Sequence, residues 1–287
     1  MLIAQITDLH VGFEPGNPQE LNQRRLDQVL QAIVDGPNRP NVLLATGDLT
    51  DSGDADSYRR CAETLNACPF PVYPCLGNHD ERANFAAHFP HIPMPDGFAQ
   101  YAVLLDGLRL VVIDTLEVGR HGGGFCETRA AWLQATLEED RATPTLIVMH
   151  HPPFEAGIEW MNTHPDEPWV QRFSDAIAGH EQIQSVVCGH IHRAIAAPWK
   201  GITVTVCPAT APQLSLNLSP IDPEMPDERP MVIADPPAYA IHRWTRNGLV
   251  SLFETAQEHP VLAKFDNRMQ AFIRELIHER PPAMVMP

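Results

Sequence analysis

The sequence predicts an α/β protein, on two observations. Short apolar runs rich in β-branched residues alternate with stretches of helical periodicity through roughly the first 200 of the 287 residues. Most of these runs are continuous rather than alternating, which suits strands buried on both faces of a sheet. The predicted strands are residues 2–6, 42–45, 72–75, 101–105, 109–113, 145–149, 185–188 and 202–206.

Between these strands, apolar residues recur three and four positions apart, as they do on one face of a helix. The stretches concerned are residues 26–34, 58–65, 132–137 and 169–177. Each helix therefore has one face with which to cover a sheet.

The composition changes after about Pro212. Six prolines between 220 and 237 indicate an ordered loop or arm. A β-hairpin is predicted over 238–253, with its turn at Asn247-Gly248, and a helix over 261–279. We divide the chain into a core, residues 1–215, and a segment, residues 216–287, that packs on the core or on another subunit.

The overall charge and composition exclude several classes of protein. A net charge of −16 argues against a long nucleic acid as partner, because such binding requires Lys and Arg to neutralise phosphates. The six cysteines form no C-x-x-C pair and no basic segment opens the chain, which favours a reduced, cytoplasmic location. No apolar run reaches the roughly 18 residues needed to cross a membrane.

Several predicted strands end in polar clusters rich in metal-ligand residue types. The clusters are Asp8-Leu9-His10, Gly47-Asp48, Gly77-Asn78-His79-Asp80, His150-His151 and Gly189-His190-Ile191-His192. Because the carboxyl ends of strands in an open α/β sheet gather along one edge, all five clusters should converge there. Any one of them alone is ordinary surface chemistry, but the whole set predicts a site.

The order of these motifs resembles the signature of calcineurin-like metallophosphoesterases, over about residues 1–215. It is most similar to the bacterial branch of glycerophosphodiesterases and class III cyclic nucleotide phosphodiesterases. The resemblance implies a four-layer αββα sandwich with two mixed sheets flanked by helices. It also implies two metal ions, and the matching positions are Asp8, His10, Asp48 and His192 for one, and Asp48, Asn78, His150 and His190 for the other.

In that pattern Asp48 bridges the two metals, and His79 contacts the phosphoryl group or protonates the leaving oxygen. Carboxylate, amide and imidazole ligands suit Mn, Fe, Co or Zn, and the absence of thiolates argues against a soft structural site. Two cations about 3.5 to 4 Å apart lower the pKa of a bridging water and clamp the phosphoryl oxygens.

Other polar residues near these motifs have more open roles. Asp80 either orients His10 or His79 through a hydrogen bond or takes part directly. His151 lines the pocket or is only a neighbour in the Pro152-Pro153 turn. Arg120-His121 and the glycines 122–124 are expected to form a flexible rim.

Three further side chains are candidate substrate contacts: Asn162 and His164, in the loop after a ligand cluster, and Thr210, after the last core strand. Thr210 is equally ordinary for a strand end.

The activity we expect is hydrolysis of a small soluble phosphodiester by a metal-bridging hydroxide. The substrate is a 3′,5′- or 2′,3′-cyclic nucleotide such as cAMP, or a glycerophosphodiester, and promiscuity is open. The alternatives are a phosphomonoesterase or protein phosphatase, a nuclease, and a non-catalytic scaffold with this fold. Related enzymes use inserted C-terminal arms for oligomer contacts, so the resemblance implies a homo-oligomer, with a monomer carrying an exposed proline-rich arm as the alternative.

Overall fold

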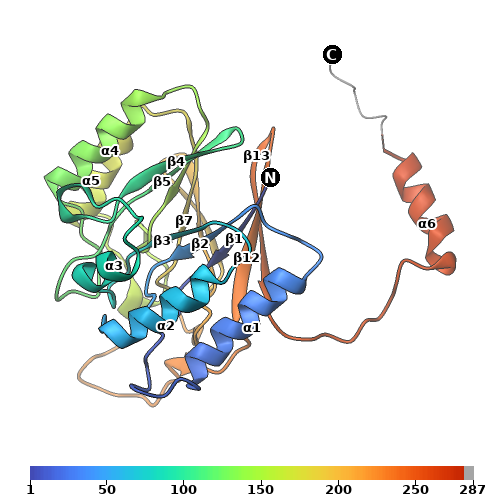
Figure 1. Ribbon diagram of the computed structural model, residues 1–287, viewed down its shortest axis with the longest axis horizontal. Helices are drawn as coiled ribbons and strands as arrows, with labels where there is room; N and C mark the ends of the chain where they lie inside the picture. The colour runs from blue at the N-terminus through green and yellow to red at the C-terminus, as the bar shows by residue number, and fades with distance from the viewer. Residues whose placement is uncertain (281–287) are drawn as a thin grey trace. The chain divides into compact units, whose positions relative to one another are not determined.

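The computed structural model describes residues 1–280 and separates into two compact units, Met1–Ala256 and Gln257–Pro287 (Figure 1). Residues 281–287, at the end of the expected segment 216–287, lie outside the described residues.

The first unit contains two large mixed sheets, which confirms the predicted architecture. The first sheet has the order β13-β12-β1-β2-β3 and the second β4-β5-β6-β7-β9-β8. The strands of the first are β1 (Leu2–Ile6), β2 (Val42–Thr46), β3 (Val72–Cys75), β12 (Ala238–Thr245) and β13 (Gly248–Thr255). Those of the second are β4 (Tyr101–Leu105), β5 (Leu108–Val112), β6 (Thr145–Val148), β7 (Ile183–Cys188), β8 (Ile195–Trp199) and β9 (Ile202–Val206).

Parallel strands run from the centre to one edge of the first sheet and fill the centre of the second. β1, β2 and β3 run parallel in the first sheet, and β5, β6, β7 and β9 in the second. All four residues of β6 are buried, as the continuous apolar run predicts. The carboxyl ends of these central strands therefore lie at one edge of each sheet.

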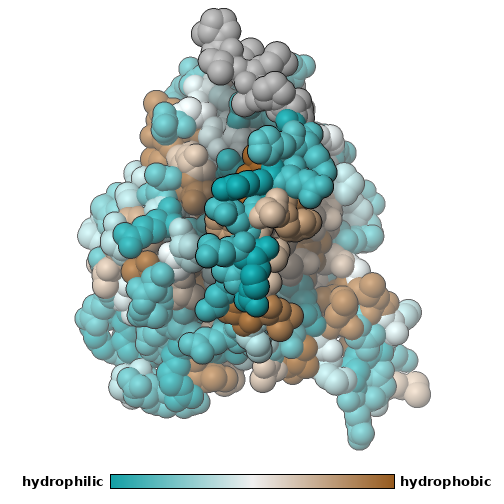
Figure 2. All heavy atoms as spheres, turned by 90° about the vertical axis from the view of Figure 1, so that its right-hand side faces the viewer, coloured by the Kyte–Doolittle hydropathy of each residue, from teal (hydrophilic) through white to brown (hydrophobic). Residues whose placement is uncertain are grey.

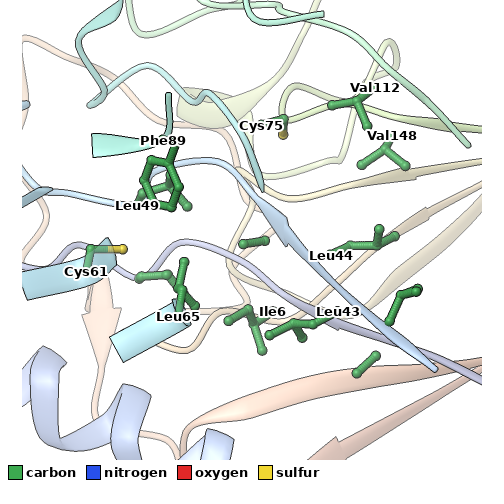
Figure 3. Packing of buried hydrophobic residues seen from close by; sticks show 14 of the residues in the cluster. Ile6, Leu43, Leu44, Leu49, Cys61, Leu65, Cys75, Phe89, Val112 and Val148 are labelled. Atoms are coloured by element: carbon green, nitrogen blue, oxygen red, sulfur yellow. The ribbon is translucent and has the colours of Figure 1, made fainter. Parts of the chain in front are cut away.

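Helices flank both sheets. The helices of the first unit are α1 (Leu21–Asp35), α2 (Ala55–Asn66), α3 (Arg82–His88), α4 (Glu127–Glu139) and α5 (Pro168–Ile177), with short 3-10 turns at Pro95–Gly97 and Glu159–Met161. The buried faces of α1 and α2 belong to one apolar core with the first sheet, and those of α4 and α5 to another with the second. Figure 3 shows that Leu44 of the first sheet and Val112 and Val148 of the second lie in the same core.

The predicted hairpin is present as β12 and β13, and it extends the first sheet. β12 pairs antiparallel with β1, with Ala4 opposite Ile241. Between β9 and the hairpin, β10 (Gln213–Leu214) and β11 (Val232–Ile233) form a small separate sheet. The proline-rich stretch is thus mostly irregular but anchored, because Arg25 donates to the carbonyl oxygens of Ala211 and Asp235.

The sequence did not predict α3, β8, β10 or β11. Helix α3 has only 7 residues, too few for a periodic pattern. β8 contains Pro198, which is tolerated because β8 is the edge strand of its sheet.

The second unit contains α6 (Asn267–His278), which begins later than the predicted 261. The carboxylate of Asp266 caps it by accepting from the backbone N–H of Arg268 and Met269. None of its residues is buried within the described range.

Most of the face drawn in Figure 2 is hydrophilic, as a net charge of −16 leads one to expect.

Across residues 1–280, no helix is both long and apolar enough to cross a bilayer. The six cysteines all lie in the described part of the chain and are free.

Candidate metal centre

Five loops meet at the carboxyl ends of β1, β2, β3, β6 and β7, as the strand-end clusters predict. Backbone hydrogen bonds join them: Asp8 N–H donates to Gly47 O (3.0 Å), and Gly189 N–H donates to His150 O (3.0 Å). The two sheets are joined directly as well, because His190 N–H donates to the Asp8 carboxylate at 3.0 Å. The site therefore lies where the two sheets meet.

Two buried carboxylates stand among three imidazoles. Asp48 Oδ2 lies 3.5 Å from His10 Nε2 and 3.4 Å from His150 Nε2. Asp8 Oδ1 lies 3.4 Å from His192 Nε2 and 3.9 Å from His150 Nε2. The arrangement brings ligand-type atoms of these five residues within a few ångströms of one another.

The backbone of the site is strained. Five non-glycine residues have φ in the left-handed region: Asp8 (51°), His10 (46°), Asp48 (48°), His190 (73°) and His192 (51°). Each such residue costs on the order of 1 to 3 kcal/mol and persists only where the surrounding structure enforces it. This concentration of strain marks a functional site.

Backbone carbonyl oxygens orient two of the imidazoles through their Nδ1 atoms, on the side of the ring opposite Nε2. Nδ1 of His150 lies 2.8 Å from Thr46 O, and Nδ1 of His192 lies 2.8 Å from Pro212 O. A carbonyl only accepts, so each Nδ1 donates a proton to it, and Nε2 is the ring nitrogen that faces the centre and would bind a metal. Such support fixes the ring and the tautomer of a metal ligand.

The donor set fits divalent cations. Asn78 Oδ1 and His150 Nε2 are buried and have no hydrogen-bond partner among residues 1–280. Burial by itself would raise the pKa of Asp8 and Asp48, but neighbouring imidazoles, chiefly His192 for Asp8 and His150 for Asp48, lower both. Two ionised carboxylates and two unsatisfied ligand atoms in one buried centre are what bound metal ions would stabilise.

Comparison with known proteins identifies the family. The family model for calcineurin-like phosphoesterases matches residues 1–194. This chain belongs to that family.

Two curated relatives carry phosphodiesterase names. A probable glycerophosphodiester phosphodiesterase of Arcobacter nitrofigilis is 26% identical over 250 residues, covering 85% of this chain and 89% of that protein. A probable cyclic nucleotide phosphodiesterase of Rhodopseudomonas palustris is 34% identical over 201 residues, covering 66% of this chain and 72% of that protein. The solved structure of a dimetal phosphatase from Danio rerio shares the fold, with a TM-score of 0.58 at 15% identity, over 90% of this chain and 99% of that chain.

One interpretation of the sequence was that Asp80 contacts His10 or His79. In this phosphoesterase, the described hydrogen bonds of Asp80 go to other groups. Its carboxylate accepts from the backbone N–H groups of Leu49, Thr50 and Gly77 and from the hydroxyl of Tyr58. Burial and the nearby Asp48 raise its pKa to about 6. Asp80 thus ties the loops after β2 and β3 together.

Asp51 makes the contacts expected of Asp80, and sequence reasoning missed it. Its carboxylate Oδ1 lies 3.2 Å from His10 Nδ1, and its backbone carbonyl oxygen accepts from His79 Nδ1 at 2.7 Å. The available signal was its place three residues after Asp48, within the same loop.

His151 is buried beside the site, so it is more than a neighbour in a turn. Its ring centroid lies 4.7 Å from that of His150 and 4.6 Å from that of His190. Burial, reinforced by His150, lowers the pKa of His151 to about 3, which keeps the ring neutral.

The three candidate substrate contacts differ in placement. Asn162 Oδ1 accepts from Gly157 N–H within its own loop, and His164 is exposed near Asp166. Thr210 is fully buried and its N–H donates to Thr7 O, so its placement does not support a substrate contact. Asn162 and His164 stay predictions.

Proposed function

We propose that this phosphoesterase holds two divalent cations and hydrolyses a small soluble phosphodiester, either a cyclic nucleotide or a glycerophosphodiester. The observation that carries the proposal is the convergence of six ligand-type side chains, Asp8, His10, Asp48, His150, His190 and His192, from four loops. Asn78 Oδ1, from a fifth loop, and His150 Nε2 are buried and have no hydrogen-bond partner among the described residues. The names of the relatives support the reaction class.

The proposed ligand sets share Asp48. Asp8, His10, Asp48 and His192 would hold one ion, and Asp48, Asn78, His150 and His190 the other. The position of Asp48 Oδ2, about equally far from His10 Nε2 and His150 Nε2, supports a bridging role. When bound, two such ions supply Lewis acidity that activates water and neutralises charge on the phosphoryl oxygens. The ligand types suit Mn, Fe, Co or Zn.

His79 is proposed as the proton donor. Its Nδ1–H is held by the Asp51 carbonyl oxygen, which leaves Nε2 as the ring atom that exchanges a proton. Water loses one proton to the solvent and attacks phosphorus as hydroxide, the bond from phosphorus to the leaving oxygen breaks, and that oxygen takes the proton from Nε2. His79 then regains a proton from the solvent. A general acid of this kind contributes about 10²- to 10⁴-fold in rate.

The charges around the site favour a diester over a monoester. The two arginines next to site residues in sequence, Arg193 and Arg120, lie 3.3 Å from Asp235 and 3.6 Å from Glu167. Because both cations face carboxylates, their attraction for the second negative charge of a phosphomonoester is reduced. A diester carries only one.

The decisive experiment compares bis(p-nitrophenyl) phosphate with p-nitrophenyl phosphate, after chelation and after reloading with Mn(II). We expect metal-dependent turnover of the diester, lost in Asp48→Ala. Preference for the monoester would favour a phosphatase. Two bound metals with no turnover of either ester would favour the scaffold.

If the diester is cleaved, cAMP, 2′,3′-cyclic AMP and glycerophosphocholine should be compared by kcat/KM. A homo-oligomer and a cytoplasmic location also belong to the proposal. Sedimentation of the full chain and localisation of a tagged copy test them.

A further inference from the structure

Both ring nitrogens of His151 are engaged by one neighbouring loop, residues 115–124. Nδ1 lies 2.8 Å from Thr115 Oγ1, and Nε2 lies 3.1 Å from the carbonyl oxygen of His121. Since a carbonyl only accepts, Nε2 carries the ring proton and Nδ1 accepts from the Thr115 hydroxyl. Both ring nitrogens therefore bond to the loop, although the ring packs against the rings of His150 and His190.

One glycine of this loop, Gly123, packs against His151. A β-carbon at Gly123 would lie 3.1 Å from Cβ and Cγ of His151 and 3.0 Å from the Trp169 ring. Gly123 and Gly124 are buried, and Gly124 N–H donates to Thr115 O at 2.9 Å. The glycine run therefore permits a close approach, whereas the sequence had favoured a flexible rim.

The other end of the contact is the exposed residue His121. Its ring centroid lies 6.1 Å from that of His79, the proposed proton donor. His151 is hydrogen-bonded to the backbone of His121, and the side chain of His121 lies next to His79. His151, which packs against His150 and His190, is thus bonded to the loop that places His121 next to His79.

We propose that His151 is a positioning residue that fixes the loop 115–124 through the carbonyl of His121 and so sets the place of the His121 ring opposite His79. The inference rests on the proposed function, because it assigns the loop a part in handling the phosphodiester. His151 lies in one group of ligand-type residues with His150 and His190, but in this role both of its ring nitrogens bond to the loop and not to a metal.

Three substitutions test this role, with a matched control. His151→Leu removes both contacts, Thr115→Val removes one, and His151→Gln keeps an N–H donor for the His121 carbonyl. The control His180→Leu removes another buried histidine, which bonds to Gln182 and lies outside the loop 115–124. We expect kcat/KM for the diester to fall at least about tenfold in His151→Leu, less in Thr115→Val, and to recover partly in His151→Gln.

Two metals per chain should remain in every variant. Loss of metal from both His151→Gln and Thr115→Val, or equal losses of activity in His151→Leu and His180→Leu, would overturn the inference.

A double-mutant cycle isolates the path through His121. If His151 acts by placing the His121 ring, His151→Leu should cost little more once His121→Ala is present. Fully additive losses would show that His151 acts by another route. If His151→Leu does not fold, Thr115→Val takes its place in the cycle.

Two measurements stand apart from turnover and separate this inference from the proposed function. In ¹⁵N NMR, His151 should be the Nε2–H tautomer. Amide hydrogen exchange of residues 115–124 should quicken in Thr115→Val and not in His180→Leu. An Nδ1–H tautomer or unchanged exchange would sink the inference even in an active enzyme. An inactive wild-type protein that passed both tests would refute only the proposed function.

Discussion

His79 donates its Nδ1–H to the backbone carbonyl oxygen of Asp51, over 2.7 Å. The carboxylate of the same residue lies 3.2 Å from His10 Nδ1. One residue therefore orients a proposed metal ligand with its side chain and the proposed proton donor with its backbone. Substitution of the side chain can separate these two effects.

Replacing Asp51 by alanine should weaken metal binding and leave His79 in place. The carbonyl oxygen survives the change, whereas His10 loses the carboxylate behind its ring. Loss of such a partner typically costs about 10- to 100-fold in metal affinity. Titration of the chelated protein with Mn(II) measures it, with Asp56→Ala as the control, since Asp56 is exposed and pairs with Arg59. Equal affinities in the two variants would contradict the assignment.

His79→Ala should lower the activity and leave metal binding unchanged. We expect kcat for the diester to fall by about 10²- to 10⁴-fold, because a proton donor is lost. The metal content should stay at two, because His79 is not among the seven proposed ligands. Steady-state kinetics and metal analysis on the same sample check both statements, with His88→Ala, on α3, as control. An unchanged kcat would remove His79 from the mechanism.

Gly47→Ala should destabilise the protein more than its backbone conformation alone explains. Gly47 has φ of +87°, and a β-carbon there would lie 2.4 Å from His150 Nδ1 and 2.8 Å from Gly77 N. Gly201 has a similar φ of +81° but no described atom within 4 Å of such a β-carbon. The difference between Gly47→Ala and Gly201→Ala should therefore be about 1 to 3 kcal/mol of overpacking. Urea unfolding of both variants measures it, and similar losses would mean that the site yields to the added methyl group.

The stability of the protein should carry a pH dependence from His242. This fully buried ring bonds to Gln5 Oε1 and Ser251 Oγ, both at 2.8 Å, and burial lowers its pKa to about 4. The unfolded chain has a pKa near 6.5, so it binds the proton first as the pH falls. The contribution of neutral His242 is complete above about pH 6.5 and is lost progressively down to about pH 4, by about 3 kcal/mol in all.

The comparison that isolates this effect is wild type against His242→Gln. The difference in their free energies of unfolding should shrink by about 3 kcal/mol between pH 7 and pH 4, while other titrations cancel. A constant difference would show that His242 is not held neutral.

The sequence was most informative where one local pattern has one structural meaning. The run Val42-Leu43-Leu44-Ala45 is apolar without alternation, and both of its faces are buried in β2. Asp48 comes three residues after this run, so its place at the sheet edge followed from the strand. The same reasoning located the ligand-type residues on all five loops.

What the sequence could not supply were distances between segments far apart along the chain. Asp80 and Asp51 are both acidic and both near ligand motifs, and only the folded loops decide which one reaches His10. His151 and Thr115 are 36 residues apart, and no local pattern connects them. Thr210 follows a strand like a site residue, but its backbone bonds to Thr7 and buries it.

The place of β1 between β2 and β12 has a consequence for how the protein is made. Gln5 on β1 and His242 on β12 are hydrogen-bonded across 237 residues of chain. At about 5 to 20 residues per second, the ribosome needs roughly 12 to 47 s to reach the second from the first. Through that interval the strand that leads into Asp8 and His10 has an open edge, the kind that pairs with other chains. That edge of β1 must therefore remain unpaired until the hairpin of β12 and β13 has been made.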